Sequence, residues 1–256
     1  MRFRRSGLPP EGRAVIEQHL AVWPLLTDDE QQRLLDVTDE LLSRKRWEAA
    51  RGFVLDDTVR IVVASQAALL VLGLSTDHFA LVSGIVMHPS TLQTSGVRAG
   101  PSTGTVSADR LAVLGLAQDG RGPVVIAWDQ ALADAHRTQP GHNVVLHEFA
   151  HKLDMLDGAI DGTPVLPPDV RADWVRICTG VYEDLVKGRP RPPMRWYGAT
   201  NPGEFFAVVT EVFFEQPQEL AAYEPELYDV LTRFYRQDPA AREARAGTPR
   251  DPGSPD

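Results

Sequence analysis

The sequence has little cysteine: Cys178 is the single one in 256 residues. One thiol cannot form a disulfide within the chain, and a chain without disulfides fits a reducing compartment. Cys178 lies in the amphipathic stretch WVRICTGVYEDLV. This setting predicts a half-buried helix residue and not a catalytic thiol.

The chain also lacks an excess of basic charge. It has 26 Lys and Arg against 35 Asp and Glu, which gives a net charge of −9 at pH 7. A nucleic-acid surface needs a concentrated basic patch. The basic runs MRFRR and KGRPRPPMR are short and are expected to be solvated loops. We therefore predict no nucleic-acid partner.

Long apolar runs are missing as well. The most apolar segment, residues 61–74, is too short to cross a bilayer and contains Ser65 and Gln66. No apolar signal-peptide core follows the arginines near residue 1. We therefore predict a cytoplasmic protein without a membrane partner.

Hydrophobic periodicity and turn residues predict a chain of helices with a few strands. Thr27 and Glu30 form a capping-box pattern at the start of the second helix. Because helices and strands do not alternate regularly, we expect an α+β domain with helices packed on a small mixed sheet and helices at its N-terminal end. Helices are expected over 11–26, 28–46, 58–72, 130–136, 144–153, 169–186, 202–215 and 224–235, and strands over 79–87, 111–116 and 124–128.

The same reading divides the chain into three parts. Residues 1–10 are expected to be a flexible arm, and residues 11–238 a single domain. Residues 239–256 are mostly Ala, Arg, Gly, Pro and Asp, which cannot bury a core. We expect this last segment to be a disordered tail.

Residues 147–151 read HEFAH. His147 and His151 stand four residues apart, so they project from one face of a helix and can bind one Zn²⁺ through ring nitrogens. Zinc lowers the pKa of its bound water from about 15.7 towards about 7, and Glu148 is placed to act as the general base. Apolar neighbours predict a buried helix, in which these polar side chains need partners. A zinc peptidase is therefore favoured over an ordinary surface helix.

A catalytic zinc usually takes three protein ligands and a water, so a third ligand is expected downstream. Glu204 and Glu211 are seven residues apart on one stripe of a largely apolar helix. Glu204 has a competing structural role, because Asn201 and Pro202 predict a helix start that puts Glu204 in the capping-box position. The residues alone leave the two glutamates equally suited.

The segments HEFAHKLD and YGATNPGEFFAVVTEVFFEQP together resemble the Mlc titration factor A family of bacterial zinc peptidases. RWEAARGFVLDDTVRIVVASQAALLVLGL and GPVVIAW resemble the same family, so the resemblance covers most of the chain. In the active-site region this family is similar to the catalytic domain of anthrax lethal factor. The resemblance implies a zincin-like metallopeptidase domain with a gluzincin-type site and one zinc ion per chain.

Carried onto this sequence, the resemblance implies that His147, His151 and Glu204 are the metal ligands. It implies that Glu148 is the general base. The choice between the two glutamates is thereby made by the resemblance, in favour of Glu204.

Three further side chains receive supporting roles. The resemblance implies that Tyr197 donates a hydrogen bond to the tetrahedral oxyanion. Glu211 becomes a candidate for orienting a metal-binding histidine, and Asp154, three residues beyond His151, is a second such candidate.

These observations predict a zinc-dependent peptidase of the gluzincin type, which hydrolyses peptide bonds of a peptide or protein substrate with a zinc-activated water and Glu148 as base. The resemblance also implies an alternative from another class. In that alternative the chain is a non-catalytic regulatory protein that sequesters a transcriptional repressor such as Mlc.

Overall fold

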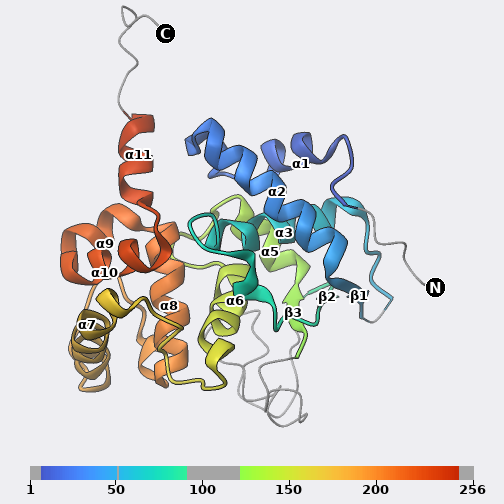
Figure 1. Ribbon diagram of the computed structural model, residues 1–256. Coiled ribbons are helices and arrows are strands. Elements are labelled where there is room, and N and C mark those ends of the chain that lie inside the picture. Colours follow the sequence, from blue (N-terminus) through green and yellow to red (C-terminus); the bar gives the residue numbers. More distant parts are fainter. Residues whose placement is uncertain (1–6, 51, 91–121, 248–256) are drawn as a thin grey trace, which may run out of the picture.

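The computed structural model describes residues 7–50, 52–90 and 122–247. Helices dominate these residues, and three short strands lie together at one side of the molecule (Figure 1). The expected α+β class, with helices on a small sheet and further helices at the N-terminal end, is confirmed. Among the described helices, none has the length and apolar character needed to cross a bilayer.

The sheet consists of β1 (Arg46–Ala49), β2 (Gly84–His88) and β3 (Val124–Ala127), in the order β1-β2-β3. All three described strands run parallel, whereas a mixed sheet was expected. Parallel neighbours need crossover connections, and the helix between β1 and β2 provides one of them.

The register of the sheet brings apolar side chains into line. Ile85 lies opposite Trp47 on one side and Val124 on the other. At Gly84, a Cβ would come within 2.8 Å of the backbone oxygen of Arg46. Glycine at this position therefore allows β1 and β2 to approach closely.

Several expected boundaries differ from the structure. The strand expected over 79–87 begins only at Gly84, because a short 3-10 helix, η2 (Thr76–Phe79), precedes it. The helix expected over 28–46 ends at Arg44, and the next residues form β1. β1 buries a single side chain in an exposed-buried-exposed-exposed pattern, so its sequence carries no clear alternation. The strand expected over 111–116 lies outside the described residues.

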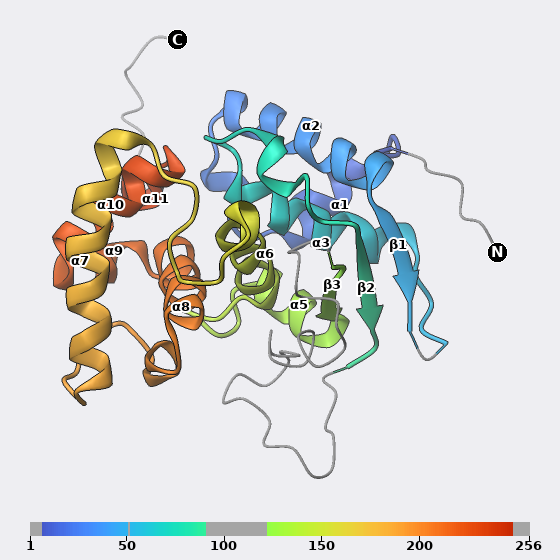
Figure 2. The same cartoon turned by 60° about the horizontal axis from the view of Figure 1, so that its bottom comes forward.

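The N-terminal helices pack beside the sheet (Figures 1 and 2). The capping box of the second helix is confirmed: the backbone N–H of Glu30 donates to the Thr27 hydroxyl at 3.3 Å, and that of Thr27 donates to the Glu30 carboxylate at 2.9 Å. The N-terminal elements beside the sheet are α1 (Gly12–His19), η1 (Trp23–Leu25), α2 (Asp28–Arg44) and α3 (Asp57–Leu70). A further helix, α5 (Trp128–Ala135), follows β3.

The C-terminal helices gather on the opposite side of the molecule (Figures 1 and 2). A helix absent from our expectation, α9, begins with a proline and buries Leu220. The elements of this part are η3 (Met155–Asp157), α7 (Pro168–Val186), η4 (Trp196–Ala199), α9 (Pro217–Tyr223), α10 (Pro225–Tyr235) and α11 (Pro239–Gly247).

The helix α11 differs from the disordered tail that we expected from residue 239. Its Arg242 is 2% exposed and pairs with Glu30 of α2 at 2.6 Å. Composition could not reveal this contact, because the two partners are more than 200 residues apart in the sequence. Residues 248–256 lie outside the described part of the chain.

Two helices, α6 (Val144–Asp154) and α8 (Pro202–Glu215), lie side by side between these two groups (Figures 1 and 2). Every residue of α6 is buried, and α8 is buried from Gly203 to Glu215. Helices that are buried all round belong to the interior of a domain. The polar side chains that α6 and α8 carry must therefore find partners inside the protein.

Candidate metal centre

The motif helix α6 starts at Asn143. The Asn143 side chain accepts a hydrogen bond from the backbone N–H of Leu146 at 3.0 Å, which is the usual geometry of a helix N-cap. From this fixed start, His147 and His151 lie one turn apart on the same face of the helix. Their side chains are 2% and 6% exposed, so neither imidazole has water as its main partner.

The helix α8 brings Glu204 to the two histidines. Asn201 caps α8 by accepting from the backbone N–H of Glu204 at 2.9 Å, and Pro202 is the first helical residue. The Glu204 side chain does not take the expected capping-box role: only its backbone N–H takes part in the cap, while its carboxylate lies against His147 and His151. Of the two places that the sequence leaves open for this carboxylate, the structure shows the one beside the histidines.

The three side chains converge on one point. Nε2 of His147 lies 3.1 Å from Oε2 of Glu204 and 3.2 Å from Nε2 of His151, and Nε2 of His151 lies 3.7 Å from Oε1 of Glu204. Tetrahedral zinc ligands at about 2.0–2.1 Å from the metal are about 3.3–3.4 Å apart. The observed spacing thus fits three ligands of one zinc ion.

The buried carboxylate supports the same fit. Oε2 of Glu204 is buried, and its contact with Nε2 of His147 at 3.1 Å does not have the geometry of a good hydrogen bond. A buried carboxylate costs free energy unless a cation is near it. Together with the facing ring nitrogens, this oxygen makes His147, His151 and Glu204 a set of donors suited to a metal ion.

The charges around His147 also favour a cation at this point. Burial lowers the pKa of His147, but the carboxylates of Glu211 and Glu204 outweigh burial and raise this pKa to about 10. Burial and the charge on His147 lower the pKa of His151 to about 4, so that His151 keeps a free lone pair. The carboxylates thus hold one positive charge between them in the metal-free protein.

Glu148 lies between the two histidines in the sequence and is also buried, at 6% exposure. Burial is the main cause that raises the pKa of Glu148 to about 7, while the charge of His147 acts in the opposite direction. A carboxyl group with a pKa in this range can accept and release a proton near neutral pH.

Glu211 supports His147 from the side opposite Glu204. Its Oε1 accepts from Nδ1 of His147 at 2.8 Å, and its Oε2 accepts from the backbone N–H of Asn143 at 2.7 Å. The guanidinium of Arg195 also pairs with Oε1 of Glu211. A histidine whose Nδ1–H is fixed in this way presents its Nε2 to a metal.

Asn143 and Arg195 were not among the residues predicted from the sequence. For Asn143 a signal exists, because an Asn directly before an apolar helical run is a typical N-cap. For Arg195 no local signal exists, since its partners Glu211 and His142 belong to other segments.

Asp154 lies in a different environment. Its carboxylate accepts the backbone N–H of Gly162 at 3.0 Å, and a second bond comes from the backbone of Thr163. Burial raises the pKa of Asp154 to about 7. Among the described residues, the hydrogen bonds of Asp154 go to this loop and not to a histidine, so its position fits a role in holding the loop after α6.

Tyr197 reaches the cluster from η4. Its ring lies over that of His147, with 6.1 Å between centroids and an interplanar angle of 28°. Burial raises the pKa of Glu204, but its contacts with His147 and Tyr197 and the charges of the two histidines lower this pKa overall. The Tyr197 hydroxyl therefore lies beside the proposed metal position.

The chain matches a known family over most of its length. The model of the glucose-regulated metallopeptidase M90 family matches residues 1–236. An uncharacterized protein of Synechocystis sp. is 36% identical over 243 residues, which cover 93% of this chain and 87% of the relative. The Mlc titration factor A of Serratia proteamaculans is 33% identical, over 86% of this chain and 85% of the relative.

The Mlc titration factor A of Yersinia pestis is 31% identical over 92% of this chain and 90% of its own length. These similarities confirm the family resemblance inferred from the motifs. The helix α11 lies beyond the residues that the family model matches. The chain is thus a member of the glucose-regulated metallopeptidase M90 family.

Proposed function

We propose that this protein is a zinc-dependent peptidase of the gluzincin type that acts in the cytoplasm. The observation that carries the proposal is the convergence of His147, His151 and Glu204, with 3.1–3.7 Å between the closest ligand atoms. Two imidazoles and one carboxylate are a donor set typical of catalytic zinc. Zinc is therefore the metal we assign to the site, with one ion per chain.

The number of ligands favours a catalytic site over a structural one. Structural zinc sites are usually closed by four protein ligands, whereas catalytic sites keep a position for water. Among the residues that the structure describes, no fourth histidine or cysteine joins the cluster. Cys178 instead lines a separate groove with Tyr182 and Phe205.

The residues of the chain would divide the reaction among them. A zinc ion held by the two histidines and Glu204 would supply an acidified water and polarise the scissile carbonyl. Glu148 would take the proton of the attacking water and pass it to the leaving amine. Tyr197 would turn its hydroxyl towards the oxygen that gains negative charge.

The proposal is tested with Glu148→Gln, which keeps the size of the side chain and removes the base. Metal content and cleavage of a peptide library are measured for the wild type and the variant. We expect about one zinc per chain in both proteins and cleavage only by the wild type. Glu226→Gln, the same change at an exposed position, serves as the control. Wild-type protein that neither contains zinc nor is activated by it would refute the proposal.

A second function is suggested by the names of two relatives, which are called Mlc titration factor A. A protein of that kind would sequester a transcriptional repressor, and binding would not require cleavage. The Glu148→Gln variant separates the two roles. Binding of the purified repressor with equal affinity by wild type and variant, without any peptide cleavage by the wild type, would favour sequestration as the function.

A further inference from the structure

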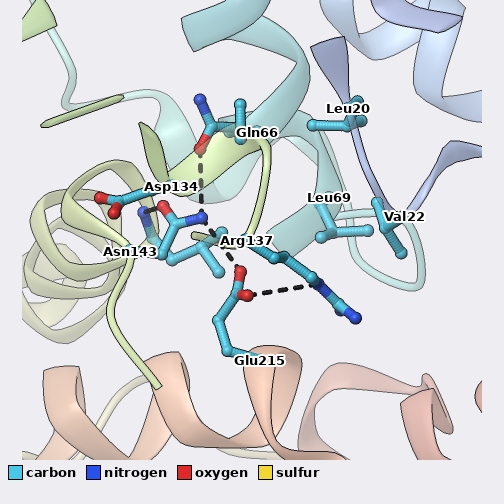
Figure 3. Close-up of a pocket in the computed structure, with 10 residues that line it drawn as sticks. Leu20, Val22, Gln66, Leu69, Asp134, Arg137, Asn143 and Glu215 are labelled. Atoms are coloured by element: carbon cyan, nitrogen blue, oxygen red, sulfur yellow. Dashed lines mark hydrogen bonds and ion pairs between the residues drawn. The ribbon is translucent and has the colours of Figure 1, made fainter. Parts of the chain in front are cut away.

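The start of the motif helix is held by side chains from two other helices. Figure 3 shows the Asn143 side chain between Gln66 and Glu215. Its Nδ2 donates to Oε1 of Gln66 and to Oε1 of Glu215, each at 3.1 Å. Its Oδ1 accepts the backbone N–H of Leu146 at 3.0 Å. Both hydrogens of this amide are therefore used between helices, and its oxygen caps α6.

Each partner of Asn143 is itself held. Gln66 donates to the backbone oxygens of Val62 at 3.2 Å and Ala131 at 3.0 Å, which fixes its Oε1 as the acceptor. Oε2 of Glu215 pairs with Nε of Arg137 at 3.2 Å, as Figure 3 shows. The orientation of the Asn143 amide thus follows from the hydrogen-bond network.

This network continues to the metal centre. The backbone N–H of Asn143 donates to Glu211 at 2.7 Å, and Glu211 accepts from Nδ1 of His147 at 2.8 Å. Asn143 and His147 are one turn apart on α6, and Glu211 and Glu215 are one turn apart on α8. Two residues of each helix therefore form one closed set of contacts. A rotation or shift of either helix would break it.

The small pocket beside this set does not indicate a ligand site. Its volume is about 10 Å³, and it is lined by residues such as Leu20, Leu69 and Leu146 besides the polar ones. A space of this size holds about one water molecule. The polar side chains around it are therefore better explained by their contacts with each other than by a bound substrate.

We propose that Asn143 and Glu215 are positioning residues for His147, and that their contacts fix the α6–α8 register in which Glu211 orients the imidazole. The inference rests on the metal site of the proposed function, but not on peptidase activity. Partners that hold a metal-binding histidine in place typically contribute about 10- to 100-fold to metal affinity. Asn143 acts one contact further away, through Glu211, and Glu215 acts two contacts further away, through Asn143.

Three variants test the proposal by zinc affinity, measured without substrate by competition with a chromophoric chelator. Glu215→Ala removes the acceptor for Asn143, and Asn143→Asp keeps the helix cap but removes both side-chain donors. We expect each to weaken zinc binding about tenfold or more. Glu215→Gln keeps an acceptor oxygen for Asn143 and turns its NH₂ group towards Arg137, whose side chain is 22% exposed and can be hydrated instead. It should therefore lose stability but keep zinc affinity within about threefold of the wild type. Because Asn143→Asp preserves the cap, it remains informative if Glu215→Ala does not fold.

Thr210→Val is the matched control for a general loosening of α8. It removes a buried hydrogen bond of 2.7 Å from the same helix to Tyr235, away from the metal centre. We expect it to lower the melting temperature without changing zinc affinity. Equal zinc affinity in the wild type and in folded Glu215→Ala or Asn143→Asp would overturn the proposal, as would an equal loss in Thr210→Val. Wild-type protein that binds zinc but cleaves no peptide would refute the peptidase function and leave this inference standing.

Discussion

Glu211→Gln is expected to weaken zinc binding as strongly as Glu211→Ala, although glutamine has nearly the shape of glutamate. Among the described residues, the three groups that pair with the Glu211 carboxylate are all donors: Nδ1–H of His147, the backbone N–H of Asn143 and the guanidinium of Arg195. A glutamine has one acceptor oxygen and must turn its NH₂ group towards at least one of these donors. In either orientation of the glutamine amide, one of its N–H groups therefore faces a buried N–H of His147, Asn143 or Arg195, and neither has an acceptor.

The size of the effect follows from the contacts that are lost. Losing the support of a metal-binding histidine weakens affinity by about 10- to 100-fold, which is about 1.4–2.8 kcal/mol. Removing one partner of a buried ion pair also destabilises the fold by about 3–5 kcal/mol. The Arg195 side chain is 20% exposed and retains some hydration, so the loss of stability should lie towards the lower end of this range.

Zinc affinity is measured by chelator competition, and stability by thermal unfolding of the metal-free proteins. Glu226→Gln, at an exposed position of α10, controls for the chemical change. Glu204→Ala provides the upper limit, because it removes a proposed ligand and should cost more zinc affinity than either Glu211 variant. The reasoning is wrong if Glu211→Gln binds zinc within about twofold of the wild type while Glu211→Ala does not.

Three other predictions follow from single contacts. Tyr197→Phe should lower kcat for peptide cleavage about 10²- to 10³-fold with unchanged zinc content, and an unchanged kcat would exclude the oxyanion role. Burial raises the pKa of Cys178 to about 12, so at pH 8 only about one thiol in 10⁴ is ionised. Alkylation of Cys178 in the native protein should therefore be slow, become faster as the pH rises, and become fast in urea. Rapid alkylation of the native protein at pH 8 would contradict this prediction. Thr27→Ala should cost about 1 kcal/mol of unfolding free energy in urea titrations, with no change in zinc affinity, and an unchanged urea midpoint would count against the capping box.

The sequence was most informative where a signal is local. The capping box at Thr27 and the motif helix could be predicted because their signals lie within a few neighbouring residues. The strand β1 could not be predicted, since its pairing with β2 involves residues almost forty positions away. The helix α11 was missed for the same reason, because the burial of Arg242 depends on Glu30.

The choice between Glu204 and Glu211 shows what helix periodicity can and cannot determine. Seven-residue spacing correctly places both on one stripe of α8, and both lie against His147. Periodicity cannot say which nitrogen of the imidazole each carboxylate meets. In the structure Glu204 lies at Nε2 and Glu211 at Nδ1, so the two glutamates are not alternatives for one role.

The contact between α6 and α8 explains the positions of one row of polar residues on each helix. On the α6 side they recur every four residues, at the N-cap 143 and at 147 and 151, and on α8 they stand at 204, 211 and 215. The two helices run antiparallel along this line. Asn143, at the start of α6, contacts Glu215 and Glu211 towards the end of α8. His147 contacts Glu211 and Glu204, and His151 contacts Glu204 near the start of α8. Apolar side chains cover most of the remaining surface of both helices. Glu204 and Glu211 therefore each contact two residues of the α6 row and Glu215 contacts one, which couples the register of the helix pair to the geometry of the metal ligands.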